Sequence, residues 1–273
     1  MQNWIADLLE RPLNIHSFLH NRYKVIRFIG KGSYGMVYLA LDQEAMKTVV
    51  VKQLRKRKSK VRLGLLQREA KMLASLTHPS IPRFIDFFQE DQKSFLVMEF
   101  VDGRNVEELL FHEGRTFNEK ESLQLLLEVL KVVEYLHQQK IIHRDLRLPN
   151  ILINEQEVFV IDFGLAAVLG KQIDPISLES MPLEKRLYRE MSVTSDFYAL
   201  GQFLLFLLYS QYEVTRKKDL SWEEELILQP ETIMIIRRLL KLNRCYEDVR
   251  DIITDIENAM ILNSSCLQKD ETT

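Results

Sequence analysis

The sequence predicts an α+β protein with a five-stranded antiparallel sheet followed by a mostly helical region. Segments rich in β-branched and aromatic residues recur at short intervals up to residue 101, which is typical of strands. From residue 118 onward, apolar residues recur at helical spacing. The 273 residues, 46% of them hydrophobic, suffice for one large domain or two lobes. We expect four parts: an N-terminal amphipathic extension (1–22), a sheet-rich lobe with one helix (23–101), a helical lobe (102–262) and a flexible polar tail (263–273).

The composition excludes several classes of protein. A formal net charge of −2, from 37 basic and 39 acidic residues, gives no general attraction to nucleic acid or acidic lipid. The only cysteines, Cys245 and Cys266, favour a reducing compartment and form neither a disulfide framework nor a metal cluster. The most apolar run, Phe197–Tyr209, would span about 20 Å as a helix, less than a bilayer core. We expect a cytoplasmic protein without a signal peptide, a transmembrane segment or a nucleic-acid partner.

Apolar patterns predict a helical segment in the extension and the strands of the first lobe. Apolar residues from Trp4 to Leu9 recur at helical spacing and are expected to pack on the first lobe. The five predicted strands are Tyr23–Ile29, Met36–Leu41, Thr48–Val51, Ile81–Phe88 and Ser94–Val101, with a turn at Gln89–Gln92.

A glycine-rich loop joins the first two predicted strands, and its residues are Gly30, Lys31, Gly32, Ser33, Tyr34 and Gly35. Glycines allow backbone amides to approach phosphate groups that bulkier side chains would keep away. Val37 and the residues after it favour a strand, whereas a dinucleotide-binding fold would continue into a helix. Taken alone, an ordinary glycine-rich hairpin explains the segment equally well.

Lys52 and Glu69 form the next candidate pair. Lys52 ends the third predicted strand, a position where a lysine is usually solvated. The following helix has an apolar face from Leu65 to Leu76, and Glu69 lies on that face. A carboxylate there is costly unless a cation meets it, and Lys52 is the obvious candidate.

A polar loop, His143-Arg144-Asp145-Leu146-Arg147-Leu148-Pro149-Asn150, follows a long helix that begins with the capping box of Asn118 and Glu121. The loop brings an acid, a cation and an amide together within six residues. A turn in which Asp145 and Asn150 satisfy backbone groups would explain the loop if it stood alone. Further on, Asp162-Phe163-Gly164 follows a short apolar strand.

Together these motifs resemble those of eukaryotic-type protein kinases, in the correct order over roughly residues 23–255. The glycine loop with Val37 resembles G-x-G-x-x-G-x-V, the polar loop resembles H-R-D-L-x-x-x-N, and Asp162 opens a D-F-G motif. The resemblance implies a bilobal protein-kinase-like fold in a compact bacterial Ser/Thr member. It also implies transfer of the γ-phosphoryl group of ATP to Ser or Thr of protein substrates, including the kinase itself.

The resemblance assigns roles to individual residues. Asp145 is then the catalytic base, and Asn150 and Asp162 hold Mg²⁺, for which Mn²⁺ can substitute. Lys52, held by Glu69, binds the α- and β-phosphates, and Arg147 replaces the usual γ-phosphate lysine. The remaining ATP contacts come from the glycine loop (Gly30, Lys31, Gly32, Ser33, Tyr34, Gly35 and Val37), the backbone of Glu99 and Val101 for the base, and Asn105 for the ribose.

Several further positions match the family or depart from it. Asp196 is expected to brace the backbone of the polar loop, with a simple helix cap as the alternative. Arg244 is expected to pair with Glu184. Val50 stands where the family usually has alanine. Ser177 matches the Thr that bonds the catalytic Asp in Ser/Thr kinases.

Two other functions remain open at this point. A pseudokinase scaffold usually lacks the Lys, the base Asp or the metal Asp, and none of these is lost here. A small-molecule kinase gains some weight from the short region between Asp196 and Arg244. The peptide-binding form of the segment from Ser177 to Glu184 argues against it.

Overall fold

The chain forms two compact units, Met1–Asp102 and Gly103–Thr273. The computed structural model describes residues 11–31, 35–54, 60–155, 157–171, 182–212 and 220–270. The predicted helical pattern at Trp4–Leu9 lies outside these residues.

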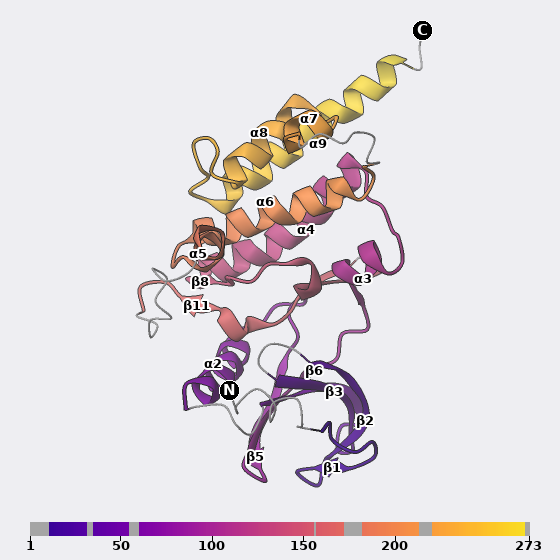
Figure 1. The fold of residues 1–273 in the computed structure, drawn as a ribbon, viewed down its shortest axis with the longest axis vertical. Coiled ribbons are helices and arrows are strands. Elements are labelled where there is room, and N and C mark those ends of the chain that lie inside the picture. Colours follow the sequence, from indigo (N-terminus) through magenta and orange to yellow (C-terminus); the bar gives the residue numbers. More distant parts are fainter. Residues whose placement is uncertain are drawn as a thin grey trace. The chain divides into compact units, whose positions relative to one another are not determined.

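The first unit contains an antiparallel sheet in the order β1-β2-β3-β4-β6-β5, and helix α2 (Figure 1). The sheet therefore has six strands rather than the predicted five. The elements are β1 (Phe18–Leu19), β2 (Tyr23–Lys31), β3 (Gly35–Asp42), β4 (Lys47–Leu54), α2 (Lys60–Ser75), β5 (Phe84–Glu90) and β6 (Lys93–Glu99).

The additional strand, β1, comes from the predicted extension. His20 and Asn21 both have positive φ (50° and 51°), and the Arg22 amide donates to the Leu19 carbonyl at 3.0 Å. This is the backbone of a type I′ turn, which folds Phe18–Leu19 back onto β2. Leu19 is thereby buried in the apolar cluster of the sheet. A two-residue strand is too short to show an alternating pattern, so no periodicity in the sequence indicates it.

The strand ends differ from the predicted ones for local reasons. β4 continues two residues past Lys52, so this lysine lies within the strand. β5 begins at Phe84 rather than Ile81, because the Ile81 amide donates to the His78 carbonyl in a turn and Pro82 has no amide hydrogen. β6 ends at Glu99, where its pairing with β4 stops, rather than at Val101.

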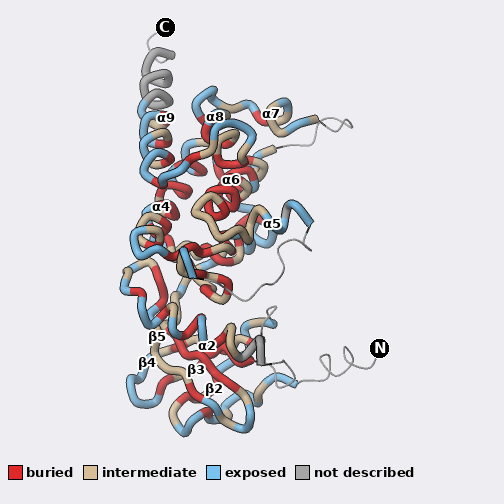
Figure 2. The backbone as a smooth tube through the Cα atoms, turned by 90° about the vertical axis from the view of Figure 1, so that its left-hand side faces the viewer, coloured by how far each residue is buried: buried red, intermediate tan, exposed pale blue. Residues whose placement is uncertain are grey.

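The second unit is mainly helical, as predicted. Helices α4 and α6 lie side by side, and they carry much of the buried core (Figures 1 and 2). The helices are α3 (Val106–Phe111), α4 (Glu119–Gln138), α5 (Leu183–Arg189), α6 (Val193–Tyr209), α7 (Trp222–Glu225), α8 (Pro230–Leu239) and α9 (Val249–Asp270). Short strands β7 (Arg104–Asn105), β9 (Ile151–Asn154) and β10 (Glu157–Val160) form one small sheet, and β8 (Ile141–Ile142) pairs with β11 (Ala167–Val168).

Helix ends in this unit test several predictions. The capping box is confirmed: Asn118 accepts from the Glu121 amide at 2.9 Å, and Glu121 accepts from the Asn118 amide at 2.8 Å. Apolar and helix-favouring residues over 221–242 would also suit one continuous helix, but the structure does not form one there. The stretch is divided into α7 and α8, because Pro230 fits the first turn of a helix but not its interior.

The last helix, α9, continues to Asp270, into residues for which a polar tail was expected. The stretch 249–270 contains neither glycine nor proline to end the helix. The apolar run Phe197–Tyr209 lies in the buried helix α6, as predicted. No helix among the described residues is long and apolar enough to cross a membrane.

The close approach of α6 and α8 gives a first prediction. A Cβ added to Gly201 would lie 2.9 Å from Leu239 Cβ and 2.9 Å from Leu240 Cδ2, whereas one added to Gly64 would meet nothing within 4 Å. Gly201→Ala should therefore destabilise the protein by about 1–3 kcal/mol despite the better helix propensity of alanine. Gly64→Ala in α2 should stabilise it by about 0.5–1 kcal/mol. Denaturant unfolding measures both changes, and equal effects of the two variants would contradict the packing argument.

Candidate active site

The first unit buries an ion pair between β4 and α2. Lys52 Nζ lies 2.8 Å from Glu69 Oε1 and 2.9 Å from Oε2. The two side chains are only 10% and 3% exposed. This confirms the pairing predicted from the acid on the apolar face of α2. Loss of either partner would leave a buried charge uncompensated, so the pair fixes the lysine in place.

The described part of the glycine loop lies at the ends of β2 and β3. Gly30 pairs with Val37 and Lys31 with Met36, while Gly32, Ser33 and Tyr34 lie outside the described residues. A Cβ on Gly35 would come within 2.0 Å of the Gln53 carbonyl oxygen, so this position requires glycine for strand packing. A Cβ on Gly30 would meet nothing within 4 Å, so side-chain packing does not require glycine at this position.

The backbone predicted to bind the base follows β6. The Glu99 amide donates to the Arg83 carbonyl at 2.9 Å, so this amide is not available to a ligand. The Glu99 side chain bonds the Arg83 guanidinium at 2.9 and 3.1 Å, which lowers the pKa of the carboxyl group. Val101 lies beyond the end of the strand and is half-buried.

In the second unit, Asp145 is the centre of a group of donors. Its side chain is 7% exposed. Arg147 contacts the carboxylate through Nε at 2.9 Å and Nη2 at 3.2 Å. Asn150 Nδ2 donates to the same carboxylate at 3.0 Å and to the Asp145 carbonyl at 2.8 Å. Arg189 Nη2 adds a contact at 3.4 Å. The predicted residues Asp145, Arg147 and Asn150 are thus brought together.

The loop that carries Asp145 is held by Asp196 of α6. The fully buried Asp196 carboxylate accepts from the backbone amides of His143 at 2.9 Å and Arg144 at 2.8 Å. His137 Nε2 lies 3.0 Å from the same carboxylate. Ser192, not Asp196, is the N-cap of α6. The predicted bracing role is confirmed, and the alternative of a simple cap is wrong.

His143 connects this loop to the segment before Asp162. Its Nδ1 accepts from the Asp145 amide at 3.3 Å, so Nε2 carries the proton and donates to the Ile161 carbonyl at 3.2 Å. The ring also packs edge-on against Phe163, with centroids 4.9 Å apart. Burial lowers the pKa of His143 below its ordinary value, and the nearby carboxylates only partly oppose this. The ring is therefore neutral near pH 7.

Asp162 and Asn150 supply the oxygen atoms that a divalent cation would need. Asp162 adopts the left-handed conformation (φ 63°), which an aspartate tolerates better than most residues, and accepts from the Gly164 amide at 3.2 Å. The contacts of Asn150 described above all use Nδ2, which leaves Oδ1 for a ligand. Carboxylate and amide oxygens suit Mg²⁺, which takes its other ligands from water and phosphate. The donor set therefore fits the predicted metal.

Arg147 lies in the field of both aspartates. The hydrogen bond to Asp145 is the main cause of its raised pKa, and the charge of Asp162 contributes to the shift. The guanidinium is therefore charged at any pH of interest. It is half-exposed, so it can reach a ligand beside Asp145.

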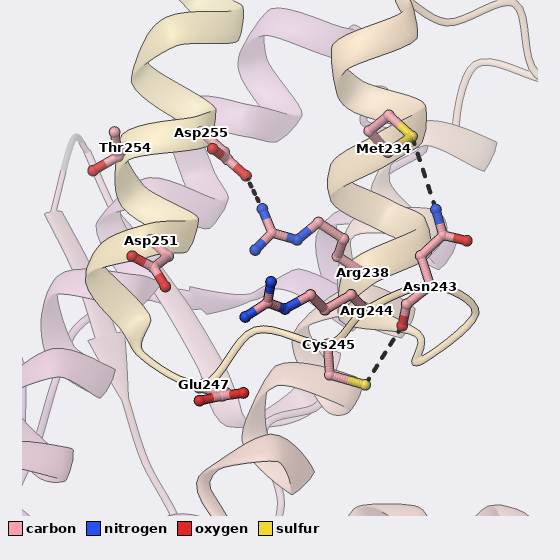
Figure 3. Close-up of a pocket in the computed structure, with 9 residues that line it drawn as sticks. All are labelled: Met234, Arg238, Asn243, Arg244, Cys245, Glu247, Asp251, Thr254 and Asp255. Atoms are coloured by element: carbon pink, nitrogen blue, oxygen red, sulfur yellow. Dashed lines mark hydrogen bonds and ion pairs between the residues drawn. The ribbon is translucent and has the colours of Figure 1, made fainter.

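Other predicted residues have different surroundings. Asn105 accepts from the Glu108 amide at 2.8 Å and caps α3, a role that the Asn-x-x-Glu spacing could have indicated. Its ribose contact stays a prediction. Ser177 and the Glu184 side chain lie outside the described residues. Arg244, the expected partner of Glu184, lines a cavity of about 610 Å³ beside α8 and α9, together with Arg238 and Asp255 (Figure 3).

Comparison with known proteins identifies the family. The model of the protein kinase domain matches residues 23–273. The chain belongs to the protein kinase family.

Individual relatives are also similar to this kinase chain. The probable serine/threonine-protein kinase YbdM of Bacillus subtilis is 42% identical over 258 residues, which cover 93% of this chain and 95% of that protein. Serine/threonine-protein kinase B of Synechocystis is 29% identical and covers 88% of this chain. The probable kinase PknB of Lactococcus lactis is 26% identical and covers 92%. The aligned regions span 47% of the Synechocystis protein and 44% of the Lactococcus lactis protein. Each of these two proteins therefore matches this chain over less than half of its own length.

The buried His143 predicts a pH dependence of stability. Below about pH 6.5 the histidine of the unfolded chain binds a proton that the buried ring resists, so stability falls as the pH decreases. The contribution of this one group approaches about 1.4 kcal/mol per pH unit. We expect His143→Asn, measured by urea unfolding between pH 5.5 and 7.5, to be less stable at neutral pH but to show a shallower slope. A slope equal to that of the wild type would contradict the assignment.

Proposed function

We propose that the chain is a Mg²⁺-dependent protein kinase that transfers the γ-phosphoryl group of ATP to Ser or Thr hydroxyl groups. The family supplies the use of ATP and a divalent metal, and the named relatives are serine/threonine-protein kinases. One observation carries the proposal for this chain's own residues: Asp145 is held beside Asn150 and Arg147 on a loop whose backbone is bonded to Asp196.

In this proposal the second unit supplies the acceptor and metal groups. Asp145 accepts the proton of the substrate hydroxyl, for which its oxygen atoms must face the attacking group. Asn150 and Asp162 would hold the metal, through the amide oxygen of Asn150 and the carboxylate of Asp162. When bound, the metal neutralises charge on the phosphate oxygens. Arg147 offers a planar guanidinium to the γ-phosphate, in place of the point charge of a lysine.

The first unit supplies the groups that bind the nucleotide. Lys52 contacts the α- and β-phosphates, and Glu69 keeps its ammonium in position. The backbone of the glycine loop, from Gly30 to Gly35, covers the phosphates. The Glu99 carbonyl and the Val101 backbone bind the base. The chemistry then depends on positioning and on charge neutralisation, since phosphoryl transfer needs little covalent participation from the protein.

The two alternatives have less support. A pseudokinase scaffold is disfavoured because Lys52, Asp145 and Asp162 are all retained and the first two are buried in paired networks. A small-molecule kinase is disfavoured because the similar proteins named above are serine/threonine-protein kinases, including one matched along 95% of its length. The partners are therefore ATP and proteins with accessible Ser or Thr, and the chain is expected to phosphorylate itself.

The test compares wild type with Asp145→Asn in the presence of labelled ATP, Mg²⁺, and a basic and an acidic generic protein. Asp145→Asn should lower phosphoryl transfer by about 10²–10⁴-fold, the usual contribution of a general base. ATP affinity, measured by fluorescence titration, should change little. Asp91→Asn, in the exposed turn between β5 and β6, is the matched control and should keep wild-type activity.

Two outcomes would contradict the proposal. Wild type that binds ATP and Mg²⁺ without transferring phosphate to either protein or to itself would favour the scaffold. Label found only on small hydroxylated compounds would favour the small-molecule kinase. Mixing active wild type with Asp145→Asn tests self-phosphorylation between molecules, because the variant then serves only as an acceptor.

A further inference from the structure

The Asp145 carboxylate already has a donor for each of its acceptor positions. A carboxylate offers about four lone-pair directions. Four side-chain contacts fill them here: two from Arg147, one from Asn150 and one from Arg189. An acceptor hydroxyl that is to donate its proton to Asp145 must therefore displace one of these donors.

Arg189 is the donor that yields most easily. Its contact is single and the longest of the four, at 3.4 Å. Arg147 holds both carboxylate oxygens, at 2.9 and 3.2 Å. Asn150 is fixed by a second bond of 2.8 Å to the Asp145 carbonyl. Arrival of the acceptor hydroxyl is therefore expected to separate Arg189 from Asp145.

A displaced Arg189 cannot simply turn into solvent. The Arg144 guanidinium bonds the Arg189 carbonyl through Nε at 3.0 Å and Nη2 at 2.6 Å, which fixes the main chain at the end of α5. The Arg189 side chain is only 24% exposed. Its Nη1 is already buried without a hydrogen-bond partner in the part of the chain that the structure describes. Loss of the Asp145 contact would leave a second donor unsatisfied at this depth, which is costly.

We propose that Arg189 selects protein substrates with a carboxylate side chain close to the acceptor Ser or Thr. The acceptor hydroxyl replaces Arg189 at Asp145, and the Asp or Glu of the substrate replaces Asp145 at Arg189. A planar guanidinium with two unsatisfied nitrogens matches a carboxylate in a two-point contact. Arg189 is thus a specificity-determining residue for the proposed kinase reaction, and this inference rests on that proposed function.

The experiment compares kcat/KM for a peptide that carries Glu with kcat/KM for the matched peptide that carries Gln. Four serine peptides each carry one Glu. The Glu lies one or two residues before the serine, or one or two residues after it. Four matched peptides carry Gln at the same positions. Wild type should prefer Glu over Gln at one or more of these positions by about tenfold in kcat/KM, the value of one charge-assisted hydrogen bond. Arg189→Met should reduce this ratio to about one. The KM for ATP should stay unchanged.

Arg186→Met is the matched control, because Arg186 is exposed on the same helix, one turn earlier. It should keep the wild-type ratio. Arg189→Gln, which removes the charge but keeps an amide donor, repeats the test if the methionine variant unfolds at a lower temperature than wild type. A wild-type ratio near one at all four positions would overturn the inference, and so would a preference that survives both Arg189 variants. Either result leaves the kinase proposal intact, since both are measured on an active enzyme.

Discussion

The arrangement of the second unit depends on one buried carboxylate, that of Asp196. The loop before Asp145 contains Arg144 in the left-handed conformation (φ 64°), so its amides cannot enter a regular ladder. Asp196 satisfies the amides of His143 and Arg144 from the first turn of α6. The helix dipole and His137 offset the cost of burying this charge. The position of Asp145 is therefore set by a helix that begins about 50 residues later in the chain.

In each unit, other buried charged groups are likewise held by oppositely charged or hydrogen-bonding partners. Glu69 is buried against Lys52 in the first unit, and Asp145 is buried among Arg147, Asn150 and Arg189 in the second. Removing one partner of such a group leaves the other desolvated and unpaired. Stability comes mainly from the apolar cores of the two units, and these ionic groups are retained because they fix the positions of functional atoms.

Much of the fold could be predicted because its signals are local. The strand segments, the Asn118–Glu121 capping box and the buried apolar helix of Phe197–Tyr209 follow from patterns that lie within one element. The errors lie where a local signal competes with another. Pro230 begins a new helix inside an apolar periodic stretch, and a type I′ turn recruits Phe18–Leu19 into the sheet without any alternating pattern.

The sequence alone determined the residues of the candidate site and one of its pairings. Motif order identifies Asp145, Asn150 and Asp162, and the acid on the apolar face of α2 indicates Lys52 as its partner. Only the tertiary structure decided that Arg189 contacts Asp145 and that Arg144 holds the Arg189 carbonyl. These contacts join α5 to a loop some 40 residues earlier, and no sequence period relates the two. Their geometry arises from the packing of separate elements, which a one-dimensional pattern does not encode.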